Sequence, residues 1–200
     1  MTVSIELQME QMGQRAKKAA RVLSAAAPAA KTQALRALAA LLIERQPDIL
    51  KANALDVNAA KAANMDAPRL DRLTLTPRIM ADMADACLHV AEMADEVGVI
   101  EQQWQRPNGL MIGKMRIPLG VIAMIFESRP NVTIDAAILC LKAGDAVILR
   151  GGSEAIHSNL ALAGLLHEAP GCPRMRRRSW KPRIAPPSPR SANLTNMWTS

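Results

Sequence analysis

Two short polar stretches carry the residues best suited to chemistry, and each follows an apolar run. The first is the loop of residues 127–131, ESRPN, and the second reads Arg150-Gly151-Gly152-Ser153-Glu154. Paired glycines permit a sharp turn and let a ligand approach the backbone closely. A helix beginning near Ser153 would present free N–H groups to an anion, and Arg150 could meet a phosphate. The second stretch can therefore be interpreted as a nucleotide site.

An ordinary structural role fits the same residues. The glycine pair also suits a common turn from strand to helix, with Ser153 as the N-cap and Glu154 as a first-turn acid favoured by the helix dipole. The first loop also suits the start of a helix, whereas its Arg129 would suit an acidic substrate. The pattern alone leaves both interpretations open.

The segments around these stretches predict the elements that position them. Apolar runs at residues 121–126 and 146–149 are typical of strands, and the apolar-periodic segment 132–142 is typical of a helix. Together they predict a strand–helix–strand unit, with a further helix starting near residue 153. Because open α/β sheets bind ligands at the carboxyl ends of their strands, both polar stretches are expected at a binding edge.

The first hundred residues are expected to be helical. Helical spacing predicts helices at about 5–27, 32–46, 47–63 and 76–96, with a short helical turn at 70–73. Thr32 is predicted as the N-cap of the second helix, and Thr76-Pro77 as the start of the last. Residues 102–105 and 110–117 flank Asn108-Gly109 and predict a β-hairpin. The expected class is α/β, with a helical layer at 1–97, a hairpin and a doubly wound, Rossmann-type sheet at 98–169, and a disordered basic tail at 170–200.

The net charge of +7 suggests nucleic acid, but its location argues against that partner for the main body. Seven of the 25 basic residues lie within 170–200, so the 18 that remain in 1–169 balance the 18 acidic residues. Cys87, Cys140 and Cys172 form no metal spacing or disulfide framework, which favours a reducing cytoplasm. We expect no metal site, no signal peptide in residues 1–13, and no run of the ~18 apolar residues that a membrane span needs.

Longer motifs resemble the gamma-glutamyl phosphate reductase family of the aldehyde dehydrogenase superfamily. The motifs are IPLGVI at 117–122, ESRPNVT at 127–133 and LRGGSEAIHSN at 149–159, with support from 71–76 and 106–110. The resemblance covers residues 1–169 and implies part of an aldehyde-dehydrogenase-like sheet. It implies the NADPH-dependent reduction of L-glutamate 5-phosphate to L-glutamate 5-semialdehyde and phosphate in proline biosynthesis. In that reaction a cysteine thiolate displaces phosphate to give a thioester, which hydride from the nicotinamide then reduces.

The resemblance also implies roles for individual residues. The adenosine half of NADPH would be held by Arg150, Gly151, Gly152, Ser153 and Glu154, with Glu154 in the place of a ribose-binding carboxylate. Substrate contacts are implied for Ser128, Arg129 and Asn131. No catalytic residue is expected in this chain, because Cys87 and Cys140 fall on apolar helix faces and the family's catalytic cysteine lies in a later domain. Glutamate 5-kinase and a second copy of the chain are the implied protein partners.

Residues 170–200 depart from the family and have no hydrophobic period. Met197 and Trp198 have one codon each, and reading one base earlier gives Tyr or His, then Val, then Asp, where the family has Tyr-Val-Asp. We therefore expect a frameshift near Ala169 and an inactive N-terminal fragment, which the DNA around that codon would decide. The alternative is a non-enzymatic module whose basic tail, with Arg176, Arg177, Arg178 and Trp180, binds nucleic acid.

Overall fold

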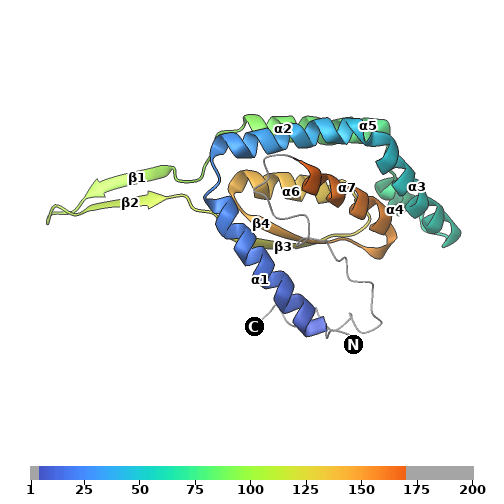
Figure 1. The fold of residues 1–200 in the computed structure, drawn as a ribbon, viewed down its shortest axis with the longest axis horizontal. Coiled ribbons are helices and arrows are strands. Elements are labelled where there is room, and N and C mark those ends of the chain that lie inside the picture. Colours follow the sequence, from blue (N-terminus) through green and yellow to red (C-terminus); the bar gives the residue numbers. More distant parts are fainter. Residues whose placement is uncertain (1–4, 170–200) are drawn as a thin grey trace.

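The computed structural model describes residues 5–169. Residues 1–4 and 170–200 lie outside the described part, and so do the predictions made for them: a disordered, frameshifted or nucleic-acid-binding tail, and Cys172. The described chain has helices first and then a hairpin and a strand–helix–strand unit, which confirms the predicted α/β class (Figure 1). None of its helices combines the length and the apolar character that crossing a bilayer demands.

Five helices form the first part of the chain: α1 (Ile5–Ser24), α2 (Pro28–Glu44), α3 (Gln46–Ala62), α4 (Ala67–Leu73) and α5 (Pro77–Glu92). Each of α2 to α5 has a proline in its first two positions, where the missing N–H has no intrahelical partner to lose. The predicted N-cap at Thr76 is confirmed, because its hydroxyl accepts a hydrogen bond from the Ile79 backbone N at 3.2 Å. The predicted N-cap at Thr32 is wrong, because Pro28 already begins that helix.

The predicted strand–helix–strand unit is confirmed. Strand β3 (Val121–Ile125) pairs in parallel with β4 (Ala146–Arg150), and α6 (Val132–Ala143) connects them. Gly144 ends α6 with a φ of 78°, a left-handed conformation that glycine adopts without strain. The next residue, Asp145, accepts a hydrogen bond from the Gly120 backbone N at 2.6 Å and so ties the start of β3 to the start of β4.

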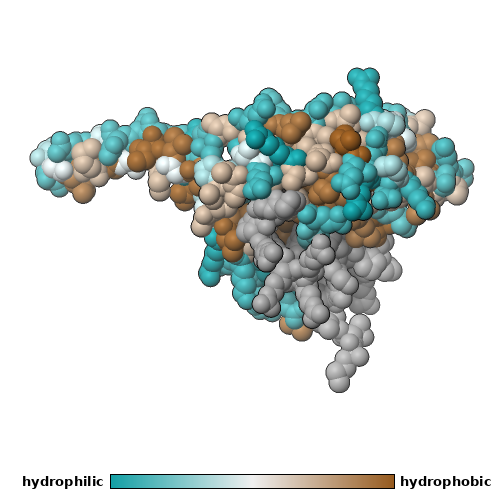
Figure 2. Space-filling model, turned by 45° about the horizontal axis from the view of Figure 1, so that its top comes forward, coloured by the Kyte–Doolittle hydropathy of each residue, from teal (hydrophilic) through white to brown (hydrophobic). Residues whose placement is uncertain are grey.

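The predicted hairpin is also confirmed, as β1 (Ile100–Gln105) paired with β2 (Met111–Met115). Its turn has Gly109 at a φ of 85°, and the Asn108 side chain accepts a hydrogen bond from the Leu110 backbone N at 3.2 Å. Figure 1 shows the hairpin projecting from the body as an arm, and Figure 2 shows apolar surface along it.

One apolar core joins the N-terminal helices to the later unit. Buried side chains of α2, α3 and α5 pack with those of α6 and of α7 (Ile156–Glu168), and Leu35, Leu42, Met80, Ile134 and Leu162 are fully buried there. A smaller cluster packs α1 against the start of β4. The division of the chain between residues 97 and 98 stays a prediction. This core fixes the position of α6 and α7 and therefore of the loops that precede them.

Candidate functional site

The two polar stretches lie side by side at one edge of the β3–β4 sheet. Parallel pairing places Ile125 opposite Arg150, so both strands end at the same level. The register continues one step further, because the Phe126 backbone N donates to the Arg150 carbonyl at 3.0 Å. The loop that follows β3 therefore runs beside the glycine turn that follows β4.

A carboxylate connects the two loops. Glu154 Oε1 accepts a hydrogen bond from the Ser128 backbone N at 2.7 Å and another from Ser128 Oγ at 3.0 Å. Ser128 has a φ of 46°, which is a left-handed conformation that non-glycine residues seldom adopt. The two bonds to an ionised acceptor compensate for that strain. A predicted cofactor residue and a predicted substrate residue thus form one unit.

Side-chain atoms pack closely against both glycines of the turn. A Cβ atom on Gly151 would overlap the side-chain nitrogen of Asn159 and crowd the ring of Phe126. A Cβ atom on Gly152 would overlap the carboxylate of Glu154. The 3-10 turn η1 (Ser153–Ala155) follows, and Ser153 does not cap it, because Gly152 occupies the N-cap position without a side-chain bond.

A buried aspartate of α3 binds backbone amides at the start of α7. Asp56 is 2% exposed, and it accepts hydrogen bonds from the backbone N of His157 at 3.1 Å and of Ser158 at 2.8 Å. It also contacts His157 Nδ1 at 2.7 Å and accepts from Ser158 Oγ at 2.6 Å. The expectation of free N–H groups at this helix is therefore wrong for these two amides, since a protein carboxylate already binds them.

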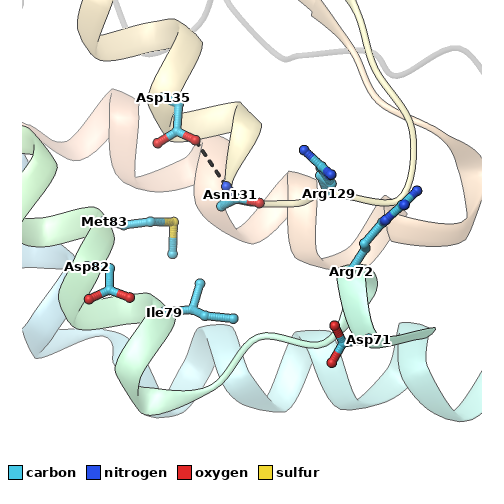
Figure 3. Close-up of a pocket in the computed structure, with 8 residues that line it drawn as sticks. All are labelled: Asp71, Arg72, Ile79, Asp82, Met83, Arg129, Asn131 and Asp135. Atoms are coloured by element: carbon cyan, nitrogen blue, oxygen red, sulfur yellow. Dashed lines mark hydrogen bonds between the residues drawn. The ribbon is translucent and has the colours of Figure 1, made fainter. Parts of the chain in front are cut away.

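Two of the predicted substrate residues line an open pocket of about 380 Å³ (Figure 3). Arg129 and Asn131 come from the loop after β3, and Asp135 follows on α6. The remaining lining residues are Asp71 and Arg72 of α4 and Ile79, Asp82 and Met83 of α5. Sequence reasoning missed Arg72, Asp82 and Asp135 as site residues. The only signal for Arg72 was its place in a family-like motif, and helical periodicity gave none for the two aspartates.

Asp135 is held in the pocket wall by a neighbour. The side-chain amide of Asn131 donates to Asp135 Oδ2 at 3.0 Å. Burial raises the pKa of the Asp135 carboxyl, while the bond from Asn131 acts in the opposite direction. Asp135 thus combines partial burial with a polar partner, as pocket carboxylates often do.

Neither cysteine of the described range has the properties of a nucleophile. Cys87 is fully buried, and burial together with the charge of Asp135 raises the pKa of its thiol to about 12. Burial and the charge of Asp145 raise the pKa of the Cys140 thiol as well. Because the thiolate is the reactive species, both thiols are inert at neutral pH.

Comparison with known proteins places these features in a family. The model of the aldehyde dehydrogenase family matches residues 3–175. A gamma-glutamyl phosphate reductase of Nitratidesulfovibrio vulgaris (strain DP4) is 70% identical over 167 residues, which are 84% of this chain and 40% of that protein. The resemblance to gamma-glutamyl phosphate reductases is thereby confirmed, and the chain spans about 40% of the length of the curated relatives it matches.

Solved structures agree in fold. The crystal structure of a gamma-glutamyl phosphate reductase from Thermotoga maritima matches with a TM-score of 0.77 and 36% identity, over 82% of this chain and 41% of that one. The enzyme of the same name from Saccharomyces cerevisiae matches with a TM-score of 0.77 and 28% identity, over 84% of this chain and 42% of that one.

Proposed function

Because the chain belongs to the aldehyde dehydrogenase family, we propose that it forms the N-terminal part of an NADPH-dependent oxidoreductase of proline biosynthesis. The reaction is the reduction of L-glutamate 5-phosphate to L-glutamate 5-semialdehyde with release of phosphate. The single observation that carries this proposal is the 70% identity over 167 residues to a gamma-glutamyl phosphate reductase.

The glycine turn after β4 is the proposed contact with the cofactor. Arg150 is exposed at the strand end, and among residues 5–169 no ion pair or hydrogen bond engages its guanidinium. That cation suits the ribose phosphate that distinguishes NADPH from NADH. Gly151, Gly152 and Ser153 form the turn beneath it, and Glu154 uses one carboxylate oxygen for Ser128. The second oxygen of Glu154 is the proposed ribose acceptor. When bound, NADPH would supply the hydride.

The loop after β3 is the proposed contact with the substrate. Arg129 and Asn131 line the pocket, whereas the Ser128 hydroxyl donates a hydrogen bond to Glu154. In this arrangement Ser128 positions the loop, and Arg129 offers a charge-assisted bond to an anionic group of the substrate. Asn131 offers an amide beside Asp135.

We further propose that the 200-residue chain alone does not turn over substrate. The described thiols, Cys87 and Cys140, are buried and un-ionised, so neither can attack an acyl phosphate. An assay of NADPH oxidation with L-glutamate 5-phosphate, or of the reverse reaction with the semialdehyde, should show no rate above that of a blank. Turnover would contradict this proposal.

Nucleotide binding tests the proposed function without requiring turnover. Titration of NADPH fluorescence with the chain should give saturable binding that is tighter than for NADH. Arg150→Ala should abolish the preference for NADPH, because the ribose phosphate loses its cation. Arg36→Ala, at an exposed position of α2, is the matched control and should keep the preference. Equal affinities for NADPH and NADH, or no binding by the folded chain, would contradict the assignment.

Location and partners follow from the same reaction. Acyl phosphates are reactive, so direct delivery from a kinase is chemically favourable, and we propose glutamate 5-kinase as a partner and the cytoplasm as the location. A second copy of the chain is the other proposed partner. Co-purification of the chain with the kinase, and its mass in solution, measure these two associations.

A further inference from the structure

The pocket of Figure 3 has charges of opposite sign on its two sides. Arg72 of α4 and Arg129 of the loop after β3 both lie on one side, where their side chains extend in different directions. Asp82 of α5 and Asp135 of α6 lie on the other side. Ile79 and Met83 supply apolar surface between the two sides, next to Asp82.

The side chains of the two arginines do not contribute polar contacts to the described fold. Among residues 5–169, no hydrogen bond or ion pair engages the side chain of Arg72 or of Arg129. Asp71 is the nearest acid in sequence to Arg72, but Figure 3 shows their side chains pointing in different directions. Two unpaired guanidinium groups on one side of a pocket attract an anion, because each offers several donors in a fixed planar arrangement.

The acidic side of the pocket argues against a simple phosphate site. Asp82 is exposed, has no ion-pair partner among the described residues, and would repel a phosphate dianion that filled the pocket. Asp135 is half-buried and oriented by Asn131. A ligand that satisfies both sides must carry an anionic group at one end and a cationic group at the other, joined by an apolar chain.

We propose that this pocket binds the extended amino-acid chain of the substrate. Arg72 and Arg129 bind the anionic end that carries the phosphate, the methylene groups cross Ile79 and Met83, and Asp82 with Asp135 binds the α-ammonium group. This inference rests on the proposed reduction of L-glutamate 5-phosphate, and it assigns Arg72 and Asp82 as specificity-determining residues. The acids explain how the site would prefer an amino acid to a plain dicarboxylic acid.

The proposal is tested with three stable probes and the chain itself. L-Glutamate has an anionic γ-end and the α-ammonium group, 4-aminobutyrate keeps a carboxylate and an ammonium at opposite ends, and glutarate lacks the ammonium group. In titrations followed by calorimetry and by amide chemical shifts, L-glutamate and 4-aminobutyrate should bind about tenfold more tightly than glutarate. A tenfold difference in affinity is what one charged contact is expected to contribute. The shifted amides should lie on α4, α5 and the loop after β3.

Charge variants separate the two sides of the pocket. Arg72→Met should weaken L-glutamate and glutarate alike by about tenfold, whereas Asp82→Asn should weaken L-glutamate and leave glutarate unchanged. Arg78→Met and Asp85→Asn, at exposed positions of α5 outside the pocket, are the matched controls. Equal affinity of the unaltered chain for L-glutamate and glutarate would overturn the proposal, even if every variant failed to fold. So would an effect of Arg72→Met no larger than that of Arg78→Met.

The nucleotide titration keeps the two proposals distinguishable. NADPH binding without discrimination among the three probes would leave the reductase assignment standing and reject the pocket assignment. Discrimination among the probes without NADPH binding would support the pocket as an amino-acid site and reject the nucleotide site at the glycine turn.

Discussion

The carboxylate of Glu154 holds Ser128 through two hydrogen bonds, at 2.7 Å from the backbone N and 3.0 Å from Oγ. Ser128 lies in the loop that follows β3, and Glu154 lies in the 3-10 turn η1, which follows β4 and the glycine pair. Because Ser128 has a φ of 46°, its conformation depends on those bonds rather than on backbone preference. A substitution in the proposed cofactor turn should therefore alter the conformation of the proposed substrate loop.

Replacing Glu154 should loosen the loop at Ser128. Glu154→Ala removes the acceptor of both bonds, and a hydrogen bond to a charged group contributes about 1.5–3 kcal/mol. Hydrogen exchange at the Ser128 amide should accelerate by about tenfold or more. Glu127→Ala, an exposed acid in the same loop, is the control and should leave that exchange rate unchanged. Unaltered protection of Ser128 in Glu154→Ala would show that the bonds do not hold the loop.

Two glycines of neighbouring elements should respond in opposite directions to alanine. Gly151→Ala places a Cβ against Asn159, which is buried and accepts a hydrogen bond from Thr133 Oγ1 at 3.0 Å, so it cannot move freely. We expect a loss of roughly 2–3 kcal/mol in the free energy of unfolding. Gly164→Ala in α7 meets nothing within 4 Å and should add about 0.5–1 kcal/mol. Urea unfolding measures both, and a smaller loss for Gly151→Ala than for an average surface change would contradict the packing argument.

Asp56 should contribute far more to stability than an exposed acid on the same helix. Asp56→Ala leaves the two amides and the hydroxyl that it binds without their acceptor, and we expect a loss of about 3 kcal/mol in the free energy of unfolding. Asp48→Ala is the matched control, because Asp48 is 76% exposed and its ion pair within residues 5–169 is a long one, to Arg45 at 3.9 Å. Its loss should stay within about 0.5 kcal/mol. Equal effects in thermal unfolding would mean that Asp56 does not fix the start of α7.

Local signals in the sequence were sufficient for the elements that hold the site. The apolar runs before residues 127 and 150 predicted β3 and β4, the Asn108-Gly109 pair predicted the hairpin, and Thr76 was correctly predicted as a cap. Each of these depends on neighbours within a few positions. The wrong N-cap at Thr32 also has a local reason, since Pro28 suits the first position of a helix and α2 begins there, four residues before Thr32.

Long-range contacts could not be predicted in the same way. Asp56 binds amides about a hundred positions later, and Arg72 and Arg129 line the same pocket although they come from α4 and from the loop after β3. A lysine near the start of a helix, such as Lys31, is expected to be exposed to solvent, yet Lys31 is 2% exposed. Its ammonium group pairs with Asp95 at 2.5 Å and donates a hydrogen bond to the Lys142 carbonyl. Periodicity reports which face of a helix is apolar, but it does not say which polar residue will find a buried partner.

The buried thiol of Cys87 should make stability fall at alkaline pH. Its pKa is raised from 9.0 to about 12 in the folded chain, mainly by burial, so the folded state keeps the proton that the unfolded state loses above pH 9. The stabilisation is fully present below pH 9 and is lost as the pH rises toward 12. Between pH 9 and 10.5, the free energy of unfolding should fall by roughly 1.5 kcal/mol more in the unaltered chain than in Cys87→Ala. Urea unfolding across this range measures the difference, and parallel pH profiles for the two proteins would show that the Cys87 thiol does not keep its proton on folding.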